Sequence, residues 1–256
     1  MNPIRQSFNR AAPAYRSVAA LQKNVATQLV DLLHNQSLAN SKGRILDAGC
    51  GTGYGLDLLP ARYPDASIIA LDFAEAMLKL LQPSFAGIRI QSDLQALPLQ
   101  TATIDVYLSS LAWQWCNSTL AAAEAARVLK PSGELLVTTL TTGTFSEFAN
   151  ALMHSGLSQA QHLLRFTTAQ EIHDALRAAN LEIVRLDVKP ITTWHPDFKS
   201  LRHSIRGVGA NHLATSTTAS ISRQARTQLL QSFERQRTAA GLPLTYNVLF
   251  IHARKD

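Results

Sequence analysis

The chain has 256 residues, of which 46% are hydrophobic and 16% are charged. This composition supplies a sizeable apolar core and excludes a wholly disordered chain. No apolar run approaches the roughly 20 residues that span a bilayer, and the polar start of the chain lacks the apolar segment of a signal peptide. We therefore expect a cytoplasmic protein with no membrane partner. Cys50 and Cys116 are too few for a disulfide framework and lack metal-site neighbours, so we expect two small buried residues and no metal.

The net charge of +6 is unevenly distributed. Residues 199–256 hold nine lysines and arginines but only two acidic residues. A basic sector of this kind favours an anionic partner through long-range attraction. Charge alone leaves four readings open: a nucleic acid, an acidic protein, an anionic small molecule, or a solvated surface without a partner.

The predicted elements begin with a helix over residues 18–33, where apolar residues recur at helical spacing. Short apolar runs then alternate with helical patterns, which predicts βαβ units and a mostly parallel sheet with helices on both faces. The predicted strands are residues 44–46, 67–71, 88–91, 104–109 and 134–139. The predicted helices between them are residues 55–62, 74–81 and 119–129, and residues 130–133 predict a turn.

The last part of the chain mixes helices and strands. Helices are predicted over residues 145–153 and 169–179, and strands over residues 181–188 and 246–252. Between those two strands lies an insertion, residues 191–241, with helical patterns at 198–206 and 222–239. The low-complexity piece 214–220 predicts a mobile loop.

The most informative segment is DAGCGTG, residues 47–53, directly after the first predicted strand. Glycines let a backbone turn sharply and approach a ligand without a Cβ in the way. Gly49, Gly51 and Gly53 therefore predict a loop like those that bind dinucleotides. Asp47 at the strand end favours a cationic ligand over a pyrophosphate. S-adenosylmethionine carries a sulfonium and an ammonium, so a carboxylate here suits that cofactor.

Two more acids follow the next two predicted strands. Asp72 lies 25 residues after Asp47, the length of one βαβ unit, and an acid there can accept hydrogen bonds from both ribose hydroxyls. Asp93 can accept from the adenine amino group, and the Leu94 amide can donate to a ring nitrogen. Each aspartate alone is more often a cap or turn residue. Three acids at successive strand ends nevertheless predict a ligand site there, because open α/β sheets bind ligands at that edge.

The segment SSLAWQWC, residues 109–116, follows the fourth predicted strand. If the ligand is S-adenosylmethionine, an attacking nucleophile would meet its methyl group at this place. Trp113 and Trp115 either line the substrate site or pack in the core, and the sequence leaves both readings open.

The order LDAGCGTG, LDFAEAML, SDLQALPL and LKPSGELLVTT resembles class I methyltransferases. That resemblance implies a doubly wound, mostly parallel, seven-stranded Rossmann-like sheet with a helical insertion before the last strand. Four outer motifs, SFNRAAPAY, SSLAWQWC, LRHSIRGVGANHL and GLPLTYNVLF, are similar to the malonyl-[acyl-carrier protein] O-methyltransferases of biotin synthesis. That family methylates the free carboxylate of a malonyl thioester.

The resemblance implies roles for particular residues. The expected cofactor-binding residues are Asp47, Gly49, Gly51, Gly53, Asp72, Phe73, Met77, Asp93, Leu94, Ser110 and Leu111. The expected catalytic residues are Tyr15, Gln114, Trp115 and Arg206, and the expected substrate-binding residues are Arg202, Asn211 and His212. Arg16 stands where the family usually has an acid and Trp113 where it usually has a smaller aliphatic residue, and we expect both to touch the substrate side.

The resemblance also implies an organisation and a partner. We expect one methyltransferase domain over residues 1–256, with N-terminal helices and a lid over 1–40 and a cofactor-binding core over 41–145. The helical insertion at 191–241 is expected to serve the substrate or partner. That partner is an acidic acyl carrier protein that carries malonyl-phosphopantetheine, and its charge would complement the basic sector.

A carboxylate acceptor sets simple chemical requirements. Its pKa near ~4 means that it is already ionised at neutral pH and needs no general base. Catalysis is then mostly positioning, with the acceptor in line with the methyl group of S-adenosylmethionine and S-adenosylhomocysteine as the product. An arginine fork suits the malonyl carboxylate, and Arg206 is the first candidate and Arg202 the second.

Three other functions remain open. A methyltransferase for another carboxylic acid or a quinone precursor would share the cofactor site. An RNA methyltransferase would suit the basic charge, but it would favour an N-P-P-Y-like motif after the fourth strand, and SSLAWQWC is not one. We therefore expect no nucleic-acid partner. A non-catalytic regulator that binds S-adenosylmethionine fits the same motifs.

Overall fold

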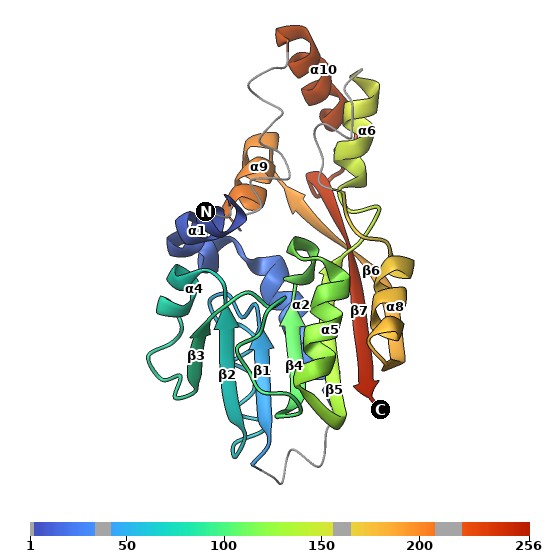
Figure 1. The fold of residues 1–256 in the computed structure, drawn as a ribbon. Coiled ribbons are helices and arrows are strands. Elements are labelled where there is room, and N and C mark those ends of the chain that lie inside the picture. Colours follow the sequence, from blue (N-terminus) through green and yellow to red (C-terminus); the bar gives the residue numbers. More distant parts are fainter. Residues whose placement is uncertain (1–2, 34–41, 156–164, 208–221) are drawn as a thin grey trace.

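The computed structural model describes residues 3–33, 42–155, 165–207 and 222–256. At its centre is a seven-stranded sheet in the order β3-β2-β1-β4-β5-β7-β6, with helices on both faces (Figure 1). Pairing is parallel from β3 to β5, whereas β7 runs antiparallel to both β5 and β6. This is a doubly wound Rossmann-like sheet, so the predicted fold class is confirmed.

The elements follow the alternation predicted from the sequence. The strands are β1 (Arg44–Ala48), β2 (Ser67–Asp72), β3 (Ile88–Gln91), β4 (Ile104–Ser110), β5 (Leu129–Leu140), β6 (Leu181–His195) and β7 (Leu242–Lys255). The helices are α1 (Pro3–Val18), α2 (Ala20–Asp31), α4 (Glu75–Lys79), α5 (Ser118–Val128), α6 (Ser146–His154), α8 (Ala169–Ala178), α9 (Phe198–Gly207) and α10 (Arg223–Glu234), with a 3-10 turn, η1 (Trp113–Trp115). In the described segments, no helix is both long and apolar enough to cross a bilayer.

Two local predictions are wrong. Residues 55–62 form a series of turns instead of a helix, because Pro60 has no backbone N–H and its ring clashes with a helical ladder. Residues 130–133, predicted as a turn before the fifth strand, lie within β5. They form a bulge, because β4 residues Ile104 and Val106 pair with Leu129 and Glu134.

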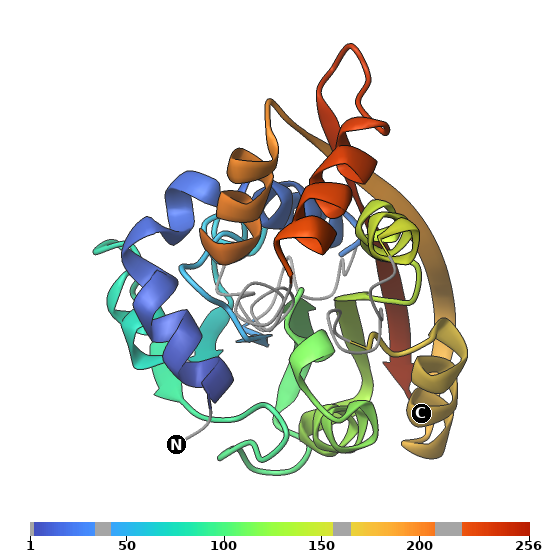
Figure 2. The ribbon, with the colours of Figure 1, turned by 90° about the horizontal axis from the view of Figure 1, so that it is seen from above.

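The pair β6–β7 carries a second layer above the sheet. Both strands extend beyond their neighbours, and α6, α9 and α10 pack around the extension (Figure 1). Phe148 of α6, Leu201 of α9, and Phe233 of α10 are buried together there with Leu244 of β7. Figure 2 shows that α9 lies beside α1 over the upper edge of the sheet, and the two helices pack together. This layer therefore covers the edge where the parallel strands end.

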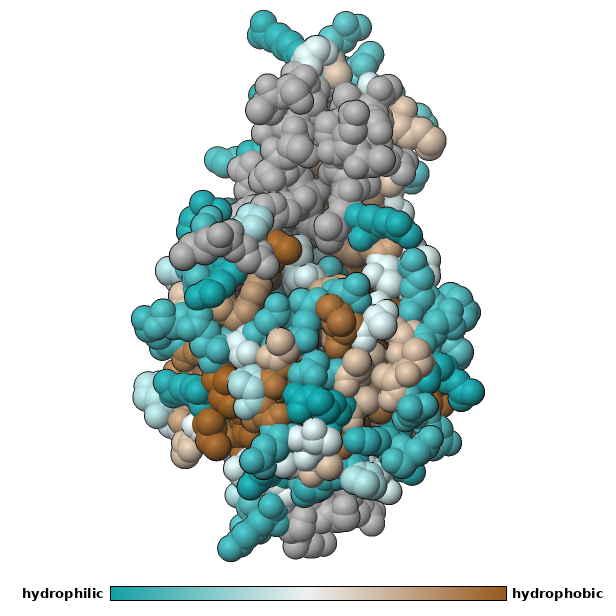
Figure 3. Space-filling model, viewed as in Figure 1, coloured by the Kyte–Doolittle hydropathy of each residue, from teal (hydrophilic) through white to brown (hydrophobic). Residues whose placement is uncertain are grey.

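The basic sector predicted over residues 199–256 does not form one surface. Its last members, Arg254 and Lys255, end β7 at the opposite end of the molecule from α9 and α10 (Figure 1). The side shown in Figure 3 is largely hydrophilic, with hydrophobic residues gathered over β3, where Ile88 is 55% exposed.

Candidate active site

A pocket with roughly 660 Å³ of empty space, its open mouth included, lies at the carboxyl ends of β1 to β4. Parallel strands of an open α/β sheet bind ligands at this edge. Helix α1 closes the pocket from the other side with Phe8 and Tyr15. The remaining lining residues are Gly49, Gly51, Leu71, Asp72, Phe73, Met77, Ser92, Asp93, Leu94, Gln95, Ser110, Leu111, Ala112, Trp115 and Cys116.

The glycine loop follows β1 and is held to the end of β2. The amides of Gly49 and Cys50 both donate to the Leu71 carbonyl, at 2.7 and 3.0 Å. Gly49 has φ +80°, and a Cβ there would lie 2.5 Å from the Ala112 side chain. Glycine is therefore required at this position by both backbone conformation and space.

Asp72 ends β2 and organises the loop around it. Its Oδ2 accepts from the Gly51 amide at 2.9 Å and its Oδ1 from the Ala74 amide at 2.8 Å. Burial raises the pKa of this carboxyl to about 6, although these backbone donors act in the opposite direction. Each carboxylate oxygen has a further lone pair, so Asp72 can still accept two ligand hydroxyls.

Asp47 of β1 does not line the pocket and is only 4% exposed. Burial, and then the nearby charge of Asp72, raise the pKa of this carboxyl to about 7. Within the described part of the chain, no donor makes a hydrogen bond to it. A buried carboxylate without a partner is costly, so this position favours a cationic ligand nearby.

The loop after β3 brings Asp93 and Leu94 to the pocket. Asp93 Oδ1 accepts from the Gln95 amide at 2.9 Å, and the Gln95 side chain amide also donates to it at 3.1 Å. Gln95 Oε1 in turn accepts from the Asn117 amide at 2.8 Å, just before α5. Gln95 thus fixes Asp93 relative to the start of α5.

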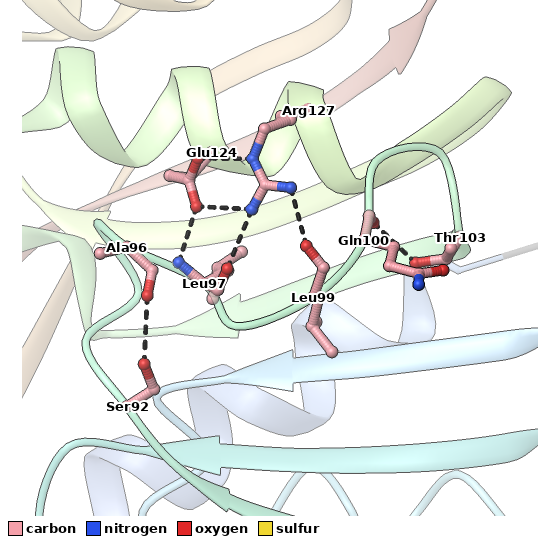
Figure 4. A network of polar contacts seen from close by, with 8 residues as sticks. All are labelled: Ser92, Ala96, Leu97, Leu99, Gln100, Thr103, Glu124 and Arg127. Atoms are coloured by element: carbon pink, nitrogen blue, oxygen red, sulfur yellow. Dashed lines mark hydrogen bonds and ion pairs between the residues drawn. The ribbon is translucent and has the colours of Figure 1, made fainter.

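Arg127 of α5 anchors the rest of that loop (Figure 4). Its guanidinium donates to the carbonyls of Leu99 at 2.7 Å and Leu97 at 3.0 Å, and pairs with Glu124. Glu124 also accepts from the Leu97 amide at 2.6 Å. These contacts attach the loop to α5 at three backbone atoms.

The segment after β4 contains a strained residue, Leu111, with φ +51°. Its amide donates to the Thr138 carbonyl at 2.9 Å, and its carbonyl accepts from Gln114 Nε2 at 2.6 Å. Thr139 Oγ1 donates to Gln114 Oε1 at 3.3 Å. Gln114 therefore does not line the pocket, and instead holds the Leu111 backbone in place.

The two tryptophans of η1 have different surroundings. Trp113 is 1% exposed, and its indole N–H lies 3.4 Å from the Tyr107 hydroxyl in the core. Trp115 lines the pocket and meets the Phe8 ring edge-on, with centroids 5.6 Å apart. Phe8 also contacts the Phe73 ring at 5.7 Å, so this aromatic group joins α1 to the sheet edge.

Tyr15 lies over the glycine loop. Its ring carbon Cε1 is 3.9 Å from the place a Cβ would take on Gly51. Burial, and then the nearby charge of Asp72, raise the pKa of the Tyr15 hydroxyl far above its usual value. The hydroxyl therefore stays protonated and can serve as a hydrogen-bond donor.

Neither Arg16 nor Trp113, which we expected on the substrate side, lines this pocket. Arg16 lies outside the pocket and pairs with the carbonyl of Thr52, within the glycine loop, and with Asp57, which follows that loop. Trp113 is part of the main core. Cys50 is buried as expected, but Cys116 is only half-buried and lines the pocket.

The structure brings most of the predicted site residues together. Eleven line the pocket: Tyr15, Gly49, Gly51, Asp72, Phe73, Met77, Asp93, Leu94, Ser110, Leu111 and Trp115. Four others do not line it: Asp47, Gly53, Gln114, which bonds to the lining residue Leu111, and Arg202 of α9. Arg206 belongs to the last turn of α9, and Asn211 and His212 fall outside the described residues.

Sequence reasoning missed six lining residues: Phe8, Leu71, Ser92, Gln95, Ala112 and Cys116. Phe8 alone carried a usable signal, because it lies seven residues before Tyr15 and so shares its helix face. In the segments that the structure describes, no three His, Cys, Asp or Glu residues gather as a metal site would require.

Comparisons with known proteins agree with this geometry. A family model described as a methyltransferase domain matches residues 46–137. Two solved structures share the fold: the YcgJ protein from Bacillus subtilis (TM-score 0.59, 19% identity, 90% of this chain and 98% of that one) and the geranyl diphosphate C-methyltransferase from Streptomyces coelicolor (TM-score 0.53, 11% identity, 90% and 77%).

Two curated relatives match nearly the whole chain. The malonyl-[acyl-carrier protein] O-methyltransferase of Dechloromonas aromatica is 38% identical over 98% of this chain and 94% of its own length. That of Herminiimonas arsenicoxydans is also 38% identical, with the same coverage. The chain belongs to the malonyl-[acyl-carrier protein] O-methyltransferase family, within the class I S-adenosylmethionine-dependent methyltransferases.

Proposed function

We propose that this protein transfers a methyl group from S-adenosylmethionine to the free carboxylate of a malonyl thioester on acyl carrier protein. The product is the malonyl-carrier methyl ester that feeds biotin synthesis, and the reaction takes place in the cytoplasm. One observation carries the proposal: Gly49, Gly51, Asp72 and Asp93 line one pocket that Phe8 and Tyr15 of α1 also line, and Asp47 is buried at the end of the strand that leads into it. The near full-length similarity to enzymes with this name supports the choice of acceptor.

The residues of the pocket fit the cofactor. A Cβ on Gly51 would meet only the Tyr15 ring, at 3.9 Å, so the backbone there is open to a ligand. Asp47 is a buried carboxylate without a hydrogen-bond donor among the described residues. Asp72 retains acceptor capacity for ribose hydroxyls, and Asp93 and the Leu94 amide suit the adenine edge. Phe73 and Met77 supply apolar surface.

The cofactor, when bound, supplies an electrophilic methyl group on sulfur. The chain then has to bind the acceptor, orient it and exclude water, because a malonyl carboxylate is already ionised and needs no base. Phe8 and Trp115 bring aromatic surface to the pocket, which lowers the water content around the carboxylate. We assign residues 1–40 to the lid and residues 191–241 to the substrate and partner side.

For the malonyl carboxylate we retain Arg206 first and Arg202 second. Both belong to α9, which packs against α1 at the covered edge of the sheet. A guanidinium that held both carboxylate oxygens tightly would quench the nucleophile, so one oxygen should stay free. Asn211 and His212 stay in this proposal as substrate residues.

The carrier protein docks on the adjacent helices α1 and α9. Besides Arg16, which pairs with Asp57, these helices contain Arg5, Arg10, Lys199, Arg202 and Arg206 and no acidic residue. An acidic carrier with a phosphate in its prosthetic arm complements such a face, which raises the encounter rate at low salt. A nucleic acid would suit the charge equally well, but the match to the family favours the carrier protein.

The test is methyl transfer from labelled S-adenosylmethionine to malonyl-carrier protein, followed by detection of a base-labile methyl ester. Acetyl-carrier protein is the matched control, because it lacks the free carboxylate. We expect label on the malonyl form alone; no label, or equal label on both, would overturn the proposed acceptor. The double charge reversal of Arg10→Glu with Lys199→Glu should lower the rate of methyl transfer to malonyl-carrier protein but not the rate with malonyl-pantetheine. Arg177→Glu on α8 should lower neither rate.

A further inference from the structure

Helix α1 is attached to the cofactor pocket at two places. Near its middle, Phe8 packs against Phe73 and Trp115, and Asn9 Oδ1 accepts from the Ala76 amide at 3.1 Å. At its end, Arg16 reaches across to the loop that begins with the glycines. The helix is therefore a cover held by two separate sets of contacts.

The contacts of Arg16 form a latch, which we define as Arg16 with Thr52, Tyr54 and Asp57. The guanidinium Nη2 donates to the Thr52 carbonyl and lies 3.3 Å from Asp57 Oδ2. The guanidinium carbon lies 5.2 Å from the centroid of the Tyr54 ring, and the Tyr54 hydroxyl donates to the Arg16 carbonyl at 2.9 Å. All three partners lie within the six residues after Gly51.

The latch is incomplete in this structure. One nitrogen, Nη2, makes both polar contacts, whereas Arg16 Nε is buried and has no hydrogen-bond partner in the described segments. The hydroxyl of Thr52 is likewise buried and without a partner there. Guanidinium and carboxylate groups interact most strongly through two parallel hydrogen bonds, so a small shift of α1 has a stabilising contact still to gain.

We propose that Arg16 is a positioning residue that couples closure of α1 to occupancy of the cofactor pocket. The inference rests on the proposed binding of S-adenosylmethionine but not on the identity of the acceptor. Phe8 and Tyr15 line the pocket from the α1 side, so the position of α1 sets how far the pocket is closed over a ligand. Because the latch partners lie beside the glycine loop, the contact that Arg16 gains when α1 closes over a ligand contributes to cofactor affinity.

The test is a double-mutant cycle read out as the affinity for S-adenosylhomocysteine by calorimetry. We expect Arg16→Ala to weaken binding about tenfold and Asp57→Asn about threefold, as fits a partly exposed ion pair with an additional ring contact. The double variant should bind like Arg16→Ala alone. Arg62→Ala, which removes an ion pair with Asp31 of similar exposure outside the site, should leave the affinity unchanged.

Hydrogen exchange supplies a second readout. The ligand should protect the amides of residues 3–18 in the wild type but not in Arg16→Ala, and the swap Arg16→Asp with Asp57→Arg should restore part of the protection. Ligand-free thermal unfolding checks that each variant folds. Wild-type affinity in Arg16→Ala, additive effects in the cycle, or undiminished protection would overturn the latch. A wild-type protein that binds no S-adenosylhomocysteine would instead overturn the cofactor assignment.

Discussion

Replacement of Asp47 by asparagine should stabilise the ligand-free protein and weaken its binding of S-adenosylmethionine. Asp47 is buried without a hydrogen-bond donor among the described residues, and its pKa is raised from 3.8 to about 7. Asparagine keeps the size of the side chain and removes the charge. The same carboxylate that favours a cationic ligand therefore opposes folding when the pocket holds no ligand.

The raised pKa gives the size and sign of the effect. A shift of about three pH units corresponds to about 4 kcal/mol of unfolding free energy. Because the folded-state pKa is raised, the penalty is absent below about pH 4, grows as the pH rises, and is complete above about pH 7. Asp47→Asn should therefore recover up to about 4 kcal/mol at pH 8, and its affinity for S-adenosylmethionine should fall about 30-fold with the loss of the charge.

The assay is thermal unfolding of both proteins without ligand at pH 8 and pH 4, with calorimetric titration at pH 8. A gain of 1 kcal/mol raises Tm by roughly 2 °C in a chain of this size, so the difference at pH 8 is measurable. At pH 4 the two proteins should unfold together, since Asp47 is then protonated. Equal Tm values at pH 8, or an equal difference at both pH values, would refute the argument from charge burial. Asp65→Asn, at an exposed carboxylate, is the control.

Three further predictions follow from the same geometry. Wild-type affinity for S-adenosylmethionine should fall about tenfold from pH 8 to pH 6, because protons compete for Asp47, whereas Asp47→Asn should show a flatter profile by calorimetry. Gly49→Ala should abolish cofactor binding in equilibrium dialysis while the chain stays folded, since the new Cβ would lie 2.5 Å from the Ala112 side chain; retained binding would contradict the required close approach. Arg127→Ala should lower the unfolding free energy by about 2 kcal/mol in urea titrations, because the carbonyls of Leu97 and Leu99 lose a charged donor; no change in stability would show that this loop is held by other contacts.

The strand-end acids were predictable because topology alone decides where they meet. A βαβ sheet places the ends of successive parallel strands on one edge, so Asp47, Asp72 and Asp93 had to converge. Strand positions were predictable for a different reason: buried parallel strands are short apolar runs. Residues 55–62 show the limit of hydrophobic periodicity as a predictor. Their apolar spacing suits a helix, but Pro60 disfavours one.

The roles of individual side chains depended on contacts that spacing does not encode. Trp113 and Trp115 lie two residues apart in a 3-10 turn, so they point in different directions, and only tertiary packing decides which enters the core. Arg16 finds its partners at Thr52 and Asp57, far along the chain, which no local pattern predicts.

The position of β7 between β5 and β6 has a consequence for synthesis on the ribosome. β7 is the last strand in the chain, yet it occupies an inner place in the sheet. Until residues 242–255 emerge, the outer edge of β5 and the whole of β6 lack their pairing partner in the nascent chain. Unpaired strand edges invite pairing with other chains. A chain whose translation stops before residue 242 would therefore have a formed glycine loop and an exposed sheet edge that can pair with other chains.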